Sequence, residues 1–153
     1  MLFEIEFPLS EQPQDAWQKL FESLDDTRIW QGHIEIKKIE EKKDSEGSTY
    51  EYIRESILAF RKKRQIEIII RDSKNNALKI IYGKGPLKGY QIFDFEYGKI
   101  IITGDINLRG ILYPFTRFAL KHIINGEINA LNRLFNKELN MDSSKELEKF
   151  GKH

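Results

Sequence analysis

The sequence contains no cysteine among its 153 residues. Disulfide bonds, thiolate metal sites and cysteine nucleophiles are therefore excluded. The three histidines are not spaced to group around a metal ion, and neither a His-x-x-x-His motif nor an acidic metal cluster is present. We therefore expect no metal ion and no other cofactor.

Long apolar runs are also lacking. None approaches the roughly 20 residues of a membrane-spanning helix, because Lys, Arg, Glu or Asn interrupts each candidate. The first residues, MLFEIEFPLSEQ, lack the basic segment and apolar core of a signal peptide. We expect a cytoplasmic protein.

An excess of one charge is missing too, since 25 basic and 24 acidic side chains give a formal net charge of +1. Without a large positive field we expect no nucleic acid as a partner. The one dense basic run, Arg61 to Arg64, is typical of a solvated hairpin turn. A weak contact of this run or of the last helix with a membrane surface or a protein stays open, as does the oligomeric state.

What the sequence does contain is enough apolar material for one core. Charged residues make up 32 % and aromatic residues 12 % of the chain, which suits a solvated exterior around large apolar groups. Folding at this length removes about 70 % of the unfolded chain's surface from water. We assign residues 1–140 to one domain and the polar residues 141–153 to a C-terminal tail.

The spacing of apolar residues predicts a strand and then a helix at the beginning of the chain. Apolar and acidic residues alternate over 2–7, as in a strand that is covered on one face. From Gln12 to Leu24 the apolar residues lie three and four apart, which predicts an amphipathic helix. Asp25 to Gly32 is expected to form a second short helix or a loop, whose Trp30 could close over the sheet.

Six strands joined by short turns are predicted for the middle of the chain, at about 34–39, 49–60, 65–71, 78–82, 90–97 and 99–108. A slip in the alternation between Ile34 and Ile39 indicates a bulge. In the third of these strands Ile66, Ile68 and Ile70 are expected to share the apolar face. The run GKGPLKG, at 83–89, predicts a flexible hairpin loop.

A long helix is predicted from about Tyr113 to Leu139. Its apolar ridge consists of Phe115, Ala119, Ile123, Gly126, Ala130 and Leu134, at spacings of three and four. We expect this helix to lie across the concave face of the sheet. The fold class is therefore α+β, with a curved antiparallel sheet of about seven strands around a long C-terminal helix and two short helices after the first strand.

Three stretches carry a resemblance to a known superfamily. Its opening strand and first helix resemble FEIEFPLSEQPQDAWQKLFESLDDTRIW, its final strand resembles KIIITGDINLRG, and its closing helix resembles LYPFTRFALKHIINGEINALNRLF. The order of elements over about Phe3 to Leu139 resembles the helix-grip fold of the START-like (SRPBCC) superfamily. Within it the sequence is most similar to the polyketide cyclase/dehydrase group and to a group of carbon monoxide dehydrogenase subunits.

The resemblance implies an apolar cavity between the sheet and the last helix, holding a lipid, a polyketide or a similar small hydrophobic molecule. Enzymes and non-enzymes share this fold, so it does not choose between them. We expect a ligand-binding protein. The alternatives are a polyketide cyclase/hydratase-like enzyme and an accessory protein. From alternation and ridge position, the expected ligand-binding residues are Trp30, Tyr52, Arg54, Phe60, Tyr82, Phe93, Phe95, Phe115, Ala119 and His122.

Polar candidates for chemistry are few, and no catalytic residue is assigned. Asp94 and Asp105 lie on neighbouring predicted strands, although Asp94 alternates with two aromatic residues and is expected to face water. His122 could transfer a proton in the cavity or could lie at the helix edge. Arg54 could line the cavity or form a cross-strand ion pair. An enzyme would need His122, Arg54 and Asp94 to converge inside the cavity.

Overall fold

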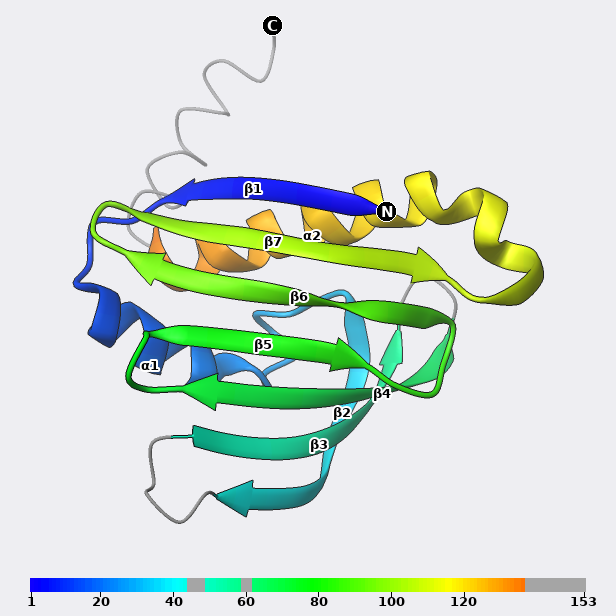
Figure 1. Ribbon diagram of the computed structural model, residues 1–153, viewed down its shortest axis with the longest axis horizontal. Coiled ribbons are helices and arrows are strands. Elements are labelled where there is room, and N and C mark those ends of the chain that lie inside the picture. Colours follow the sequence, from blue (N-terminus) through cyan, green and yellow to red (C-terminus); the bar gives the residue numbers. More distant parts are fainter. Residues whose placement is uncertain (44–48, 59–61, 137–153) are drawn as a thin grey trace, which may run out of the picture.

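The computed structural model describes residues 1–43, 49–58 and 62–136, of which 38–43 and 49–58 are described by their backbone alone. It consists of a seven-stranded antiparallel sheet with two α-helices against one face (Figure 1). The α+β class and the long C-terminal helix on the sheet are confirmed. The predicted tail and the last residues of the predicted helix lie outside the described residues.

Consecutive strands of the sheet pair as hairpins, except at one edge. The order is β1-β7-β6-β5-β4-β3-β2, so the first strand pairs with the last. The strands are β1 (Leu2–Pro8), β2 (His33–Lys43), β3 (Thr49–Leu58), β4 (Lys63–Asp72), β5 (Ala77–Tyr82), β6 (Leu87–Glu96) and β7 (Lys99–Leu108). All neighbouring strands are antiparallel.

Alternating burial along the strands places the core on the face that carries the helices. In β7 every second residue from Ile100 to Leu108 is buried, as one-sided coverage requires. The pairing of β2 with β3 shifts register after His33 and again after Lys38. The predicted irregularity in this strand is confirmed.

Strand β4 has the opposite phase to the prediction. Its buried residues are Gln65, Glu67 and Ile69, at 0 %, 1 % and 0 % exposure, whereas the expected apolar face, Ile66, Ile68 and Ile70, is only half-buried. The reason is that the two buried polar side chains, Gln65 and Glu67, point to the concave face of the sheet and contact neighbouring segments there. Gln65 bonds to the next loop, and Glu67 lies opposite Tyr82 in the register.

Helix α1 (Pro13–Ser23) confirms the first predicted helix, with Pro13 in its first turn. Its buried Trp17 donates a hydrogen bond from Nε1 to the carbonyl of Ala77 at 2.8 Å. Residues 25–32 form turns, so of the two alternatives for this segment the loop is confirmed and the second short helix is wrong. Asp26 accepts hydrogen bonds from the backbone N–H and the guanidinium of Arg28, which favours a local turn over a continued helix.

The last helix begins later than predicted. A 3-10 helix, η1 (Gly110–Phe115), precedes α2 (Thr116–Phe135). Thr116 fixes the junction, since its hydroxyl donates to the carbonyl of Tyr113 at 2.7 Å and accepts from the N–H of Leu108 at 3.0 Å. Beyond this junction α2 crosses behind β7 and β6 (Figure 1).

Candidate ligand-binding cavity

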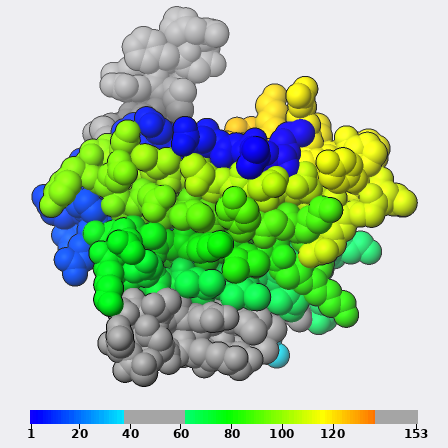
Figure 2. Space-filling view, in the orientation of Figure 1, coloured from blue at the N-terminus to red at the C-terminus, as the bar shows by residue number. Residues whose placement is uncertain are grey.

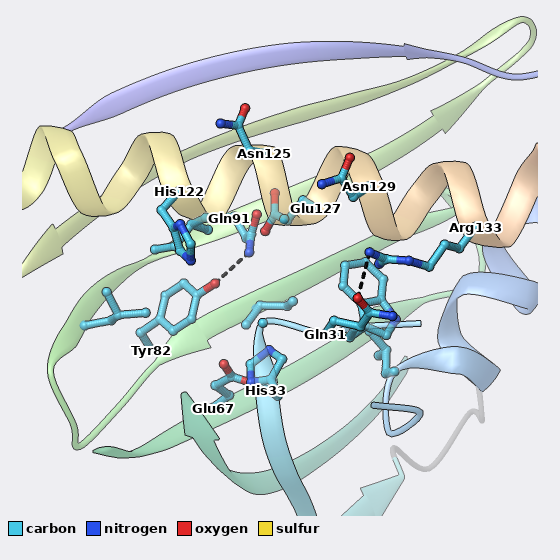
Figure 3. A pocket seen from close by; sticks show the side chains of 17 residues that line it. Gln31, His33, Glu67, Tyr82, Gln91, His122, Asn125, Glu127, Asn129 and Arg133 are labelled. Atoms are coloured by element: carbon cyan, nitrogen blue, oxygen red, sulfur yellow. Dashed lines mark hydrogen bonds between the residues drawn. The ribbon is translucent and has the colours of Figure 1, made fainter. Parts of the chain in front are cut away.

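A cavity of about 290 Å³ lies between α2, the concave face of the sheet and the turns after α1 (Figure 3). For comparison, an apolar cavity of about 150 Å³ is sufficient to hold benzene. The residues that line the cavity of this protein are Leu24, Trp30, Gln31, Gly32, His33, Glu67, Ile80, Tyr82, Leu87, Gln91, His122, Ile123, Asn125, Gly126, Glu127, Asn129 and Arg133. Part of this lining is exposed, namely Gln31, Gly32, His122, Asn125 and Asn129, and these residues form the rim.

The floor of the cavity is built by strand register. Glu67 of β4 lies opposite Tyr82 of β5, and Gln91 of β6 lies opposite Ile80 of β5. Because successive side chains of a strand point to opposite faces, these four all point to the concave side. Three neighbouring strands therefore deliver a carboxyl, a phenol and an amide to one place.

These polar groups are only partly satisfied by one another. The amide nitrogen of Gln91 donates to the hydroxyl of Tyr82 at 2.6 Å. Within the described part of the chain, neither the Gln91 amide oxygen nor the Oε2 atom of Glu127 has a hydrogen-bond partner. Leaving a buried polar atom unpaired costs about 1–3 kcal/mol, so two such atoms in one cavity require an explanation.

Among the residues that line the cavity, Glu127 has the most strongly shifted pKa. Burial raises its pKa to about 8, the negative charge of Glu67 adds to the rise, and a hydrogen bond with the Gln91 side chain opposes it. Figure 3 shows Glu127 beside Gln91, between α2 and the sheet. At neutral pH this carboxyl is therefore mostly protonated, and a protonated carboxyl can donate a hydrogen bond.

The wall after α1 is held by its own polar contacts. Trp30 is buried, and its Nε1 donates to the hydroxyl of Ser23 at 3.1 Å. From α2, Arg133 donates to the carbonyl of Ile29 at 2.7 Å and to the side-chain oxygen of Gln31 at 3.0 Å. One arginine thus fixes this wall to the helix on the other side of the cavity.

The glycine-rich loop at 83–89 is anchored by two side chains. Gln65 donates to the carbonyl of Gly83 and accepts from the N–H of Leu87, and Arg109 donates to both of these residues' carbonyls. Gly85 has a φ of +144°, and a Cβ there would lie 2.3 Å from the Gln65 side-chain oxygen. Gly85 therefore permits a close approach of this loop to β4.

The structure distributes the predicted ligand-binding residues over several environments. Trp30, Tyr82 and His122 line the cavity. Phe93, Phe95 and Ala119 are buried in the core and do not line it. The side chains of Tyr52 and Arg54, and all of Phe60, lie outside the described residues.

Phe115 is placed away from the cavity. Its side chain is 62 % exposed. The predicted ridge treats Phe115 as part of the long helix, but the helix begins only at Thr116. The preceding 3-10 helix turns at three residues per turn and rotates Phe115 out of the ridge.

The acidic pair considered from the sequence does not form. Asp94 lies opposite Ile101 and Asp105 lies opposite Tyr90, on the outer face of the sheet. Partial burial and the nearby Glu96 raise the pKa of Asp94. The pKa of Asp105 is lowered, chiefly by a hydrogen bond from the amino group of Met1. Neither carboxyl converges with His122.

Sequence reasoning missed the three residues that define the site, Glu67, Gln91 and Glu127. A signal for Glu127 is present, because this position lies four residues after Ile123 and four before Leu131 and so falls within the apolar stripe. The assumption that polar residues face water hides it. Among the described residues no group of three or more acidic or histidine side chains could hold a metal ion.

Comparison with known proteins identifies the fold. No family model matches the chain, and no curated protein matches it. Among solved structures, the ZhuI aromatase/cyclase from Streptomyces sp. R1128 has a TM-score of 0.73 at 10 % identity, covering 91 % of this chain and 95 % of that one. The protein TTHA0849 from Thermus thermophilus has a TM-score of 0.68 at 11 % identity, covering 94 % and 99 %.

A START superfamily protein from Mycobacterium smegmatis is also similar, with a TM-score of 0.58 at 9 % identity, covering 87 % of this chain and 98 % of that one. These similarities show that the chain has the helix-grip fold of the START-like superfamily. Within the described residues, neither helix has the length and apolar content that a membrane span requires.

Proposed function

We propose that the chain binds a small, mainly apolar and uncharged molecule in the cavity, and that Glu127 donates a hydrogen bond to an oxygen of that molecule. The apolar part of the lining, Leu24, Trp30, Ile80, Leu87 and Ile123, supplies affinity through burial, at about 25 cal/mol per Å² removed from water. The polar floor would select and orient one end of the ligand.

The observation that carries this proposal is the buried Oε2 atom of Glu127, which has no hydrogen-bond partner among the described residues. A protonated carboxyl aimed into a cavity needs an acceptor, and a ligand carbonyl supplies one. The Gln91 amide oxygen, also unpaired, could accept from a ligand hydroxyl. Glu67 also lines this cavity, and its negative charge would repel an anionic ligand.

The test compares three two-ring probes by equilibrium dialysis at neutral pH: 2-acetylnaphthalene, naphthalene and 2-naphthoate. We expect saturable binding of the ketone near one to one, weaker binding of naphthalene and no saturable binding of naphthoate. Glu127→Leu should remove the preference for the ketone over naphthalene, a change of up to about tenfold, because one hydrogen bond is lost.

Glu127→Gln keeps a hydrogen-bond donor and should retain the preference. Glu96→Gln, which changes an exposed carboxyl on the same sheet, is the matched control. The proposal fails if the unaltered protein takes up no probe, or if Glu127→Leu leaves the ratio of ketone to naphthalene binding unchanged.

A second candidate function, acid–base catalysis, is favoured by the presence of Glu67 and His122 in the same cavity as Glu127. Glu127 would donate a hydrogen bond to a carbonyl oxygen while a base takes a proton from the adjacent carbon, leaving an enolate. The acetyl protons of 2-acetylnaphthalene report this step through exchange with deuterium in D2O, followed by NMR. If the ketone binds but its acetyl protons exchange no faster than in buffer without protein, catalysis is rejected and only the ligand-binding function is supported.

A further inference from the structure

A second surface of the molecule has no role in the cavity. Nine large apolar side chains among the described residues are exposed, and four of them fall between positions 111 and 118. They are Ile111, Tyr113, Phe115 and Phe118, at 92 %, 56 %, 62 % and 80 % exposure. We refer to these four residues as the η1–α2 patch. Figure 2 shows their segment, in yellow, protruding at one end of the molecule.

The backbone that presents this patch is ordered by specific contacts. Gly110 adopts a φ of +62°, a left-handed conformation that lets the chain change direction after β7. The N–H of Arg109 bonds to the carbonyl of Pro86 at 2.9 Å, and Thr116 ties the start of α2 to Leu108. The outward position of the aromatic side chains is therefore built into the fold rather than produced by a frayed end.

The charged residues of the segment that carries the patch are all basic. Residues 109–126 include Arg109, Arg117 and Lys121, all exposed, and contain no Asp or Glu. From β6, the Lys88 ammonium lies 5.7 Å from the ring centre of Tyr113. In a chain whose net charge is only +1, this is a local positive field around an apolar protrusion.

We infer that the η1–α2 patch docks on an anionic lipid surface. Aromatic side chains favour the boundary between headgroups and acyl chains, and each nearby Lys or Arg adds about 1 kcal/mol of attraction to anionic lipid. An exposed apolar group of this size on its own would fit many partners, but the neighbouring cations and the absence of acidic residues from positions 109–126 favour a negatively charged surface.

Docking in this manner would also bring the cavity to the membrane. His122, the first cavity residue of α2, lies one helical turn beyond Phe118. The inference does not depend on the proposed ligand, since the patch residues lie outside the cavity lining.

The test is co-sedimentation of the full chain with vesicles of phosphatidylcholine alone or mixed with phosphatidylserine. We expect binding to the mixed vesicles that weakens with added salt. Phe115→Ser with Phe118→Ser should reduce the bound fraction about tenfold or more. Arg117→Glu with Lys121→Glu should reduce it by about 25-fold or more on mixed vesicles, because about fivefold is lost with each cation and the new carboxylates are repelled by the anionic lipid.

Matched controls come from the other end of the sheet. Tyr97→Ser removes an aromatic side chain that is 82 % exposed in the β6–β7 hairpin, and Lys74→Glu reverses an exposed charge in the β4–β5 turn. Both should bind vesicles like the unaltered protein. Folding of each variant is checked by circular dichroism, and its cavity by uptake of 2-acetylnaphthalene.

Three results would overturn the inference. The first is an absence of vesicle binding at low salt, and the second is equal loss of binding in the controls and the patch variants. The third is concentration-dependent dimerisation in analytical ultracentrifugation that Phe118→Ser abolishes, since the patch would then be covered by a second copy. Vesicle binding with no probe uptake would support docking and reject the proposed ligand site.

Discussion

The beginning and the middle of α2 present opposite exceptions to the usual separation of apolar and polar residues. At its start Phe118 is 80 % exposed, whereas in its middle Glu127 is 7 % exposed. Phe118 and Glu127 lie about two and a half helical turns apart and so on opposite faces of α2. Glu127 faces the sheet and the turns after α1, whereas Phe118 faces away from them, although Thr116, Ala119 and Leu120 beside it are buried. A side chain's environment on this helix therefore depends on the face that it occupies, and each exception coincides with a surface for which we propose a role.

The largest expected effect of a core substitution comes from the covered part of the helix. Leu131 is 0 % exposed, so Leu131→Ala should lower the free energy of unfolding by about 2–5 kcal/mol through lost burial and the cavity left behind. Chemical denaturation monitored by circular dichroism measures this. A loss below about 1 kcal/mol would show that the middle of α2 is not packed as described.

The buried carboxyl should make stability depend on pH. The pKa of Glu127 is about 8 in the folded chain, whereas the ordinary pKa of a glutamate is 4.5. Between these values the folded state keeps a proton that the unfolded state releases, so the free energy of unfolding falls as pH rises through this window and levels off above it. Glu127→Gln removes this contribution.

The variant should therefore gain stability relative to the unaltered protein between pH 5 and pH 8, by a few kcal/mol in total. Denaturation curves at several pH values measure the difference, in which contributions of other groups cancel. Glu96→Gln, at an exposed position, should show a constant difference. A constant difference for Glu127→Gln as well would contradict the raised pKa.

A smaller effect is expected where α2 holds the wall of the cavity. Arg133→Met removes both hydrogen bonds to the turns after α1 while keeping much of the side chain's volume. We expect a loss of about 1–2 kcal/mol in stability, together with weaker uptake of 2-acetylnaphthalene. Arg117→Met, on the exposed start of the same helix, should change neither quantity. Equal effects of the two substitutions would mean that Arg133 does not position the wall.

The smallest effect on stability is expected for the outward-facing side chain Phe118 at the start of the helix. Phe118→Ala should change the free energy of unfolding by less than about 0.5 kcal/mol, since its ring is already in water. The same denaturation assay compares it with Leu131→Ala. If Phe118→Ala costs as much as Leu131→Ala, the ring is packed and the contrast between the two parts of α2 is lost.

The order of strands and helices could be predicted because apolar periodicity is strong where one face of an element is covered. β7 and α1 are examples, with alternation in the first and spacings of three and four in the second. The predicted phase of β4 is wrong because isoleucine occupies three consecutive positions, 68–70, so apolarity alone does not fix it. The helix expected within residues 25–32 is wrong because the backbone contacts there are those of local turns.

The cavity lining could be predicted only in part, namely at Trp30, Tyr82 and His122. Trp30 and Tyr82 could be found because aromatic residues suit a cavity wall. Glu67, Gln91 and Glu127 could not, because sequence reasoning places polar residues in water unless a partner is visible. Their partners come from other strands and from α2, and such contacts depend on the register, which the sequence pattern does not specify.

The pairing of β1 with β7 has a consequence for the route by which the chain folds. Every other strand pair joins consecutive strands, whereas Leu2 lies opposite Asp105. Local hairpins close short loops, but this pair must close a loop of most of the chain, which carries a larger entropy loss and slows the search. We expect the meander from β2 to β7 to assemble first and β1 to join it late.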